Sequence, residues 1–138
     1  MHAFVHSLSL EMSFAYCIDL PAPFGENPAE GHVIAVDRNR IDPIVVDTTS
    51  GAMAELDAVG LTVRGVSQLP PMAQAGPASA VLNGLLYLGR GPSVRVILLE
   101  AHQVVHEFGV AHGVRGLGLS ANRKRLWVGQ PDRVIAKS

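Results

Sequence analysis

The sequence has few cysteines and few charged residues. Only one of its 138 residues is a cysteine, Cys17, so an intrachain disulfide and a zinc site with several cysteine ligands are excluded. Charged residues make up 17% and the formal net charge is -1, which excludes the basic surface of a general nucleic-acid binder. With 48% hydrophobic residues, the composition is not that of a disordered protein. We expect a globular domain with a real core and no nucleic-acid partner.

Signals for secretion and membrane insertion are also missing. The first basic residue is Arg38, whereas a secretory signal begins with a basic region. The longest uncharged stretch, residues 65–89, could span a bilayer by length but contains three prolines and several polar side chains. We therefore expect a loop and a strand there, no membrane partner, and a cytoplasmic location by default.

Acidic and basic residues are divided unevenly along the chain. Residues 1–60 hold nine acidic and two basic residues, a formal charge of -7. Residues 61–138 hold three acidic and nine basic residues, a formal charge of +6. Complementary charge of this kind favours head-to-tail contact between copies, and two merely solvated surfaces are the alternative.

Short apolar segments bounded by Gly, Pro, Asn and Asp recur along the chain and predict strands. Most have four to seven residues rich in Val, Ile, Leu and Tyr. Residues 50–59 and 100–108 are the two segments with a pattern that could form helices, while residues 21–30 and 70–78 are rich in Pro and Gly and predict loops. The expected strands are residues 14–20, 32–37, 43–47, 85–89, 94–100, 116–119, 125–129 and 133–136.

Two short patterns occur twice, which is typical of a repeat architecture. Val63-Arg64-Gly65-Val66 recurs as Val114-Arg115-Gly116-Leu117, each time after an acid that closes an apolar segment, Asp47 or Glu100. Leu8-Ser9 precedes an aromatic segment centred on Tyr16 at the spacing at which Leu119-Ser120 precedes one centred on Trp127. Tyr87 lies at the centre of a third such segment.

Joined end to end, these patterns resemble the blade repeat of β-propellers, in particular the YVTN-type and quinoprotein-dehydrogenase-like propellers. The stretch VRGLGLSANRKRLWVGQ, from residue 114, is similar to the family pattern V.GLALSPDGKRLYVA, and residues 31–66 and 86–120 carry the same likeness. The resemblance implies four-stranded antiparallel blades with a tight turn in which Asn122 adopts the left-handed conformation. It also implies close approach of inner strands at Gly65, Gly116 and Gly118, and the side chains of Tyr16, Tyr87 and Trp127 between neighbouring sheets.

Chain length limits this interpretation. A blade takes about 40 to 50 residues and a closed propeller has about four to eight blades. We therefore expect an all-β fold in which residues 1–138 form a single domain of two to three propeller-like blades, incomplete as a single chain. Such a chain would be a segment of a longer propeller, or several copies would complete a ring through their blade edges.

Candidate metal ligands are densest around His102 and His106, with Glu107 and His112 nearby. On a helix the two histidines would share a face, whereas on a strand they would lie too far apart for easy chelation. Asp37 and Glu100 each follow an apolar segment, as do the metal-binding carboxylates of RNase H-like nucleases, but the late acidic pair of those enzymes is missing.

Nucleophile motifs are weak. Cys17 lies in an apolar segment without a basic neighbour, which predicts an inert buried thiol. Ser9 and Ser120 lack the glycines of a nucleophile elbow, and residues 47–51 predict a turn rather than a phosphate loop.

The sequence therefore favours a non-catalytic β-propeller-type scaffold that binds a protein or a small-molecule ligand through loops such as residues 21–30 and 70–78, with no cofactor and no metal. The alternative is a metal-dependent hydrolase or RNase H-like nuclease that uses Asp37 and Glu100 or the His102 and His106 cluster. A truncated product without a function of its own is the third hypothesis.

Overall fold

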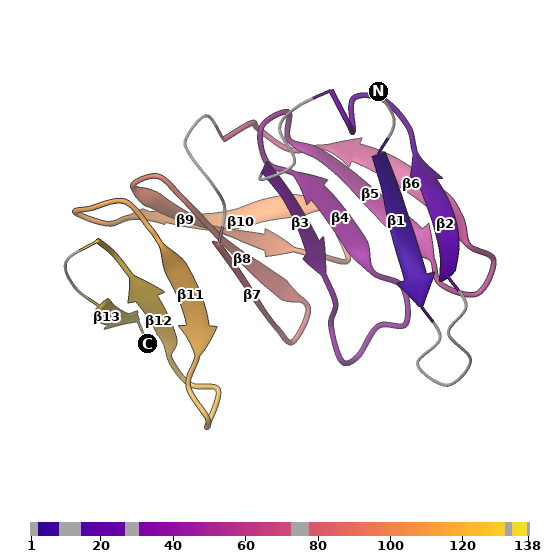
Figure 1. The fold of residues 1–138 in the computed structure, drawn as a ribbon. Coiled ribbons are helices and arrows are strands. Elements are labelled where there is room, and N and C mark those ends of the chain that lie inside the picture. Colours follow the sequence, from indigo (N-terminus) through magenta and orange to yellow (C-terminus); the bar gives the residue numbers. More distant parts are fainter. Residues whose placement is uncertain (1–2, 9–14, 27–30, 73–77, 132–133, 138) are drawn as a thin grey trace.

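The computed structural model describes residues 3–8, 15–26, 31–72, 78–131 and 134–137, which form four antiparallel sheets (Figure 1). Sheet I pairs β1 (Ala3–Leu8) with β2 (Ala15–Leu20). Sheet II contains β3 (His32–Ala35), β4 (Ile44–Asp47), β5 (Ala52–Asp57) and β6 (Thr62–Gln68). Sheet III contains β7 (Ala78–Leu82), β8 (Leu85–Arg90), β9 (Ser93–Leu98) and β10 (Gln103–Gly109). Sheet IV contains β11 (Gly116–Leu119), β12 (Leu126–Gly129) and β13 (Val134–Lys137).

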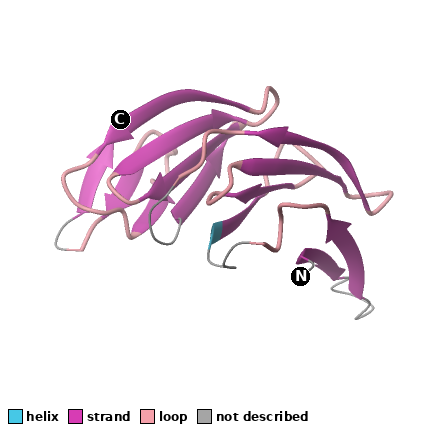
Figure 2. Ribbon diagram, turned by 90° about the horizontal axis from the view of Figure 1, so that it is seen from above, coloured by secondary structure: helices cyan, strands magenta, loops and turns pink. Residues whose placement is uncertain are grey.

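In every sheet the strands lie in chain order, so each sheet is an antiparallel meander. The sheets themselves also follow one another in chain order across the molecule (Figures 1 and 2). Among the described residues there is no helix long and apolar enough to cross a membrane. The expected all-β fold with antiparallel sheets is confirmed.

Three apolar clusters hold adjacent sheets together face to face. Successive side chains of a strand point to opposite faces, so a sheet between two others must be apolar on both. In β4, Val45 packs toward sheet I while Ile44 and Val46 pack toward sheet III, which explains why all three of its apolar residues are buried. The I/II cluster contains Ile18, Leu20, Phe24, Val45, Ala52, Ala54 and Leu56. The II/III cluster contains Val33, Ala35, Ile44, Val46, Met53, Leu69, Met72, Leu86, Leu88, Ile97 and Leu99. The III/IV cluster is built on Val94, Val114, Leu126 and Val128.

Side-chain hydrogen bonds fix the β4–β5 turn. The fully buried Asp47 carboxylate accepts hydrogen bonds from the Thr49 backbone N at 3.1 Å and the Ser50 hydroxyl at 2.9 Å. Gly51 completes the turn with a φ of +83°, a conformation that costs glycine nothing. The predicted turn at residues 47–51 is confirmed.

The two segments with helical patterns are strands. Residues 50–59 contain β5 and residues 100–108 contain most of β10. Neither segment is long enough to form a stable helix by itself. As strands, β5 pairs with β4 and β6 on its two sides, and β10 pairs with β9 on one side. The helical pattern of these two segments therefore does not correspond to helices, and β1, β6 and β7 were not predicted.

The two sequence repeats have different structural outcomes. Residues 63–66 lie in β6, the fourth strand of sheet II, whereas residues 114–117 span the connection into β11, the first strand of sheet IV. The Val-Arg-Gly repeat therefore does not mark equivalent positions. The Leu-Ser pattern does mark equivalent hairpins. Leu8 of β1 pairs with Ala15 of β2, and Leu119 of β11 pairs with Leu126 of β12 in the same way.

Two details of the expected turn and strand packing are corrected. The left-handed residue of the β11–β12 turn is Arg123, with a φ of +58°, because the Asn122 side chain accepts a hydrogen bond from the Lys124 backbone N at 3.1 Å instead. A Cβ added at Gly65, Gly116 or Gly118 would meet no atom within 4 Å, so these glycines do not mark close approaches.

Candidate functional site

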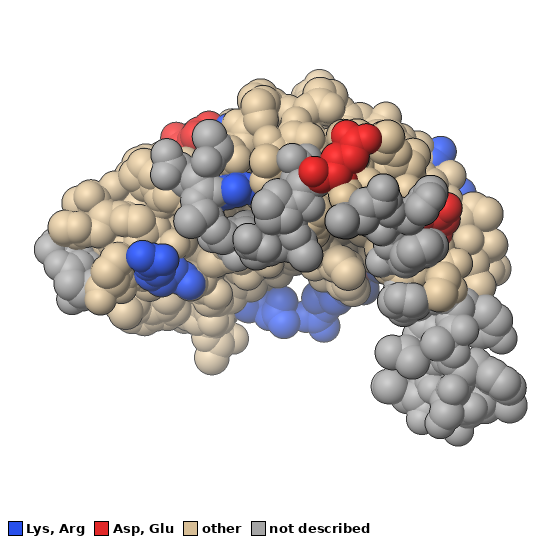
Figure 3. Space-filling view, turned by 45° about the horizontal axis from the view of Figure 1, so that its top comes forward, with Lys and Arg blue, Asp and Glu red and all other residues tan. Residues whose placement is uncertain are grey.

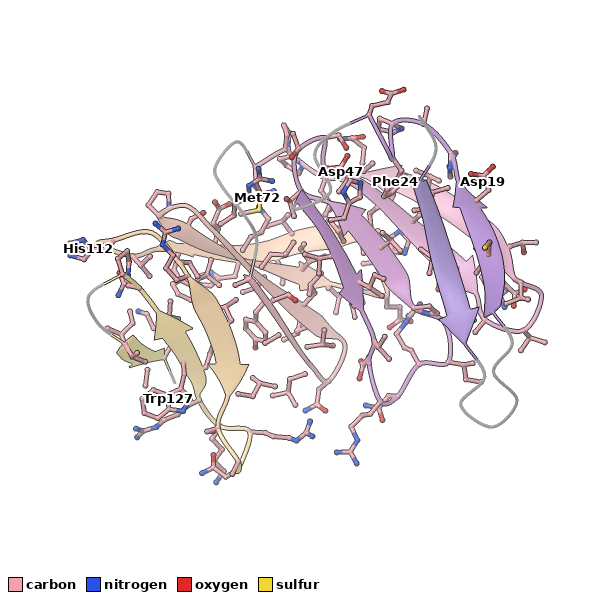
Figure 4. All side chains as sticks on the ribbon, viewed as in Figure 1. Asp19, Phe24, Asp47, Met72, His112 and Trp127 are labelled. Carbon is pink, nitrogen blue, oxygen red and sulfur yellow. The ribbon has the colours of Figure 1, made fainter. Side chains whose placement is uncertain are left out.

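No other described sheet covers one face of sheet IV, and Trp127 lies on that face, on the central strand β12 (Figure 4). On β12, Leu126 and Val128 are buried against sheet III. Trp127 alternates with them, so its side chain points to the other face, where it is 44% exposed. In register, Gly118 and Ala136 flank it on the neighbouring strands. A large aromatic side chain thus stands between two small residues on an open sheet.

The row that contains Trp127 has buried or partly buried counterparts in sheets II and III. In each case the row runs across the first three strands of its sheet and lies on the face directed toward the next sheet in chain order. The rows are Val33, Val46 and Met53 in sheet II, Ala80, Tyr87 and Val96 in sheet III, and Gly118, Trp127 and Ala136 in sheet IV. Tyr87 lies between sheets III and IV as predicted, whereas no described sheet covers Trp127. Tyr16 lies in β2, and its side chain is outside the described part.

The candidate metal ligands are dispersed. His102 lies in the β9–β10 turn with a φ of +54°, and His106 is exposed on β10 after a β-bulge, with its ring 6.0 Å from that of Phe108. Glu107 pairs with Arg95 at 3.5 Å, and His112 lies beyond β10. The residues that the structure describes contain no group of three His, Cys, Asp or Glu side chains that could hold a metal ion.

Asp37 and Glu100 line the same hollow, but the Asp37 carboxylate is hydrogen-bonded to backbone N–H groups. Its carboxylate is 4% exposed and accepts hydrogen bonds from the backbone N of Gly84 at 2.6 Å and of Asn39 at 3.3 Å. It thereby fastens the end of β3 to the β7–β8 turn of sheet III. Glu100 is exposed, and nothing in this geometry favours the hydrolase or nuclease alternative.

A polar contact between sheets II and III uses His102 in a way that the sequence did not predict. Ser67 of β6 lies with its hydroxyl oxygen 2.6 Å from His102 Nδ1. Glu55 of β5 approaches His102 Nε2 to 3.8 Å, and Arg40 donates a hydrogen bond to the same carboxylate. These residue types occur in acyl-transfer triads, but such a triad needs a hydrogen bond from imidazole to carboxylate, and 3.8 Å is too long. The four side chains come from separate segments with no local motif, so the cluster could be found only in the folded chain.

Replacing Ser67 by alanine is expected to lower the free energy of unfolding by about 1 kcal/mol, because His102 loses a partly buried hydrogen bond between two sheets. Urea denaturation measures the loss. Ser93→Ala is the matched control, because Ser93 is also half-buried in a strand. An equal loss in both variants would contradict a specific role for the contact.

Asp57 stabilises the surface turn between β5 and β6. The Asp57 carboxylate accepts hydrogen bonds from the backbone N of Gly60 at 2.9 Å and of Val59 at 3.0 Å. These bonds, helped by Arg64, hold the pKa of Asp57 below its usual value of 3.8. The ionised carboxylate therefore stabilises the β5–β6 turn above that pH, and the contribution is lost as the pH falls through the lowered pKa.

The structure describes two of the three nucleophile candidates, Cys17 and Ser120. Cys17 is exposed, contrary to the expected buried thiol, because Ile18 and Leu20 occupy the covered face of β2. The Ser120 hydroxyl accepts hydrogen bonds from the backbone N of Lys124 and of Arg125, so it stabilises a turn. Ser9 lies outside the described residues.

The described parts of the two Pro-rich segments pack between sheets. Phe24 is 1% exposed in the I/II cluster and Met72 is 7% exposed in the II/III cluster. Residues 27–30 and 73–77 lie outside the described part, and Ala78 begins β7.

Comparison with known proteins shows the fold. No family model and no curated protein sequence matches the chain. The hydrazine synthase structure from Kuenenia stuttgartiensis matches 70% of this chain at 22% identity and a TM-score of 0.55. The apo AztD structure from Citrobacter koseri matches 89% at 17% identity and a TM-score of 0.52. The sheets are β-propeller-like blades.

A third propeller structure, Hsv2 from Kluyveromyces lactis, matches 75% of this chain at 13% identity and a TM-score of 0.50. The chain spans 28% of the hydrazine synthase chain, 28% of AztD and 30% of Hsv2. At these identities the blade architecture is shared and no activity follows from it.

Proposed function

We propose that the chain is a non-catalytic propeller-type scaffold, with blades of the YVTN and quinoprotein-dehydrogenase-like type, that joins another β-sheet through the open face of sheet IV. The observation that supports this is the position of Trp127. Its row is covered by the next sheet in both sheet II and sheet III, and it is 44% exposed in sheet IV. Exposed tryptophans beside small residues are typical anchors of protein interfaces.

A second copy of this chain is the partner that we propose for this face. The N-terminal half carries a formal charge of -7 and the C-terminal half +6, so a head-to-tail arrangement places opposite charges together. Asp19 is exposed on β2 of sheet I, at the far end of the molecule from Trp127 (Figure 4). On the face drawn in Figure 3, basic side chains lie at the sheet IV end, along the lower middle and at the opposite edge, and acidic side chains lie on both halves of the view.

The test is the solution mass of the wild-type chain and of Trp127→Ser, measured by sedimentation over a range of concentrations. We expect the wild type to self-associate, more strongly at low salt, and Trp127→Ser to weaken the association at least about tenfold because an interface anchor is removed. Val59→Ser is the control, because Val59 is 84% exposed in a turn of sheet II. A wild type that stays monomeric, or a control that weakens association equally, would refute the proposed partner.

A further inference from the structure

A cleft of about 470 Å³ opens between sheets III and IV, on the side of β12 opposite to Trp127. Apolar side chains from both sheets form most of its wall, with Leu82, Leu85, Tyr87, Val96, Phe108 and Leu119 among them. Its volume lies within the range of about 300 to 1,000 Å³ that is usual for small-molecule sites. The cleft is separate from the open face, so it does not depend on the function proposed above.

Four cations line the same cleft. Arg123, Lys124 and Arg125 come from the β11–β12 turn, and Lys137 comes from β13. No acidic residue is among the lining residues, and none of the four cations forms an ion pair with a described acid. The Lys137 ammonium lies 5.2 Å from the centre of the Phe108 ring, which brings one charge directly against the apolar wall.

The two features make opposite demands on a ligand. Apolar walls are stabilised when a hydrophobic group displaces water from them. Four neighbouring cations without acidic partners repel one another and are stabilised by an anion. A simple phosphate would leave the walls in contact with water, and a neutral hydrocarbon would leave the cations uncompensated.

We propose that this cleft binds a small amphipathic anion, with an aliphatic body against Leu85, Tyr87 and Leu119 and a carboxylate head at Lys124, Arg125 and Lys137. Several cations around one carboxylate give charge-assisted hydrogen bonds, which are stronger than neutral ones. The hydrogen bonds of Ser120 and Asn122 fix the backbone of the turn that carries Lys124 and Arg125, so less of the chain has to be ordered when the head group binds.

The experiment is calorimetric titration of the whole chain with dodecanoate below its micelle concentration. Acetate supplies the head group without the tail, and dodecyltrimethylammonium supplies the tail with the opposite charge. We expect saturable one-to-one binding of dodecanoate, at least about tenfold weaker binding of both other probes, and weaker dodecanoate binding at high salt. Equal binding of acetate or of the cationic detergent would overturn the assignment, as would no binding of dodecanoate.

Variants locate the binding within the protein. The double substitution Lys124→Gln with Arg125→Gln removes two exposed cations from the cleft and is expected to weaken dodecanoate binding about tenfold. Arg115→Gln is the matched control, because Arg115 is an exposed cation in the connection before β11 and does not line the cleft. Equal weakening in the control would show general electrostatic attraction rather than this site. An unfolding midpoint equal to that of the wild type would show that the double variant is folded and that its loss is confined to the cleft.

Discussion

Alanine at position 51 is expected to cost at least about 3 kcal/mol of the free energy of unfolding, which is a large part of the stability of an ordinary domain. Gly51 has a φ of +83°, where an L side chain is strained by about 1 to 2 kcal/mol. The added Cβ would also overlap the backbone oxygen of Leu69 and lie 2.9 Å from its carbonyl carbon. The Leu69 backbone N donates a hydrogen bond to the Gly51 oxygen at 2.7 Å, so the two segments cannot separate without losing that bond.

Displacement of Leu69 has a further cost because its side chain is 3% exposed in the II/III cluster. The measurement is urea denaturation of Gly51→Ala beside Gly65→Ala. Gly65 lies in β6, and a Cβ there would meet no atom within 4 Å, so its replacement is expected to be neutral or slightly stabilising. Equal losses in the two variants would contradict the role given to the left-handed turn.

Truncation of Ile97 to alanine is expected to cost about 2 to 5 kcal/mol, because it removes three methyl or methylene groups from a fully buried position. Ile97 of β9 lies between Leu86 of β8 and Val104 of β10 in register, and its side chain packs in the cluster that joins sheets II and III. A cavity there weakens the contact between the two four-stranded sheets.

Thermal or urea denaturation measures this loss, with Ile41→Ala as the control. Ile41 is 80% exposed, so the same truncation is expected to change the free energy of unfolding by no more than about 0.5 kcal/mol. A small loss for Ile97→Ala would mean that the core collapses to fill the space, or that sheets II and III are not joined as described.

The all-β fold could be predicted because the strand signal is local. Runs such as residues 43–47 and 85–89 are apolar, short and bounded by turn residues, and β4 and β8 lie where those runs predict. Strands that contain both apolar and polar residues could not be predicted from short apolar runs. β5 and β10 contain polar residues at spacings that also fit a helix, and pairing with the neighbouring strands β4, β6 and β9 decides between the two.

The sites required the tertiary structure. Ser67, His102 and Glu55 meet because sheet III packs on sheet II, and no spacing in the sequence encodes that packing. The exposure of Trp127 has the same origin, since the sequence shows an aromatic strand but not whether a sheet covers it. The two Val-Arg-Gly segments lie at different positions in their sheets, one in a fourth strand and the other at the start of a first strand. Strand pairing sets the limits of each blade, and a short sequence match does not reveal them.

The division of the core into three separate clusters, each shared by two adjacent sheets, makes this molecule close to a one-dimensional array. Its stability is then a sum of terms for each sheet and for each contact between neighbours. Substitutions in different clusters should combine additively, whereas substitutions within one cluster should not. Sheets I and IV have one stabilising neighbour each among the described sheets, so opening should begin at these two ends and reach β4 and β9 last.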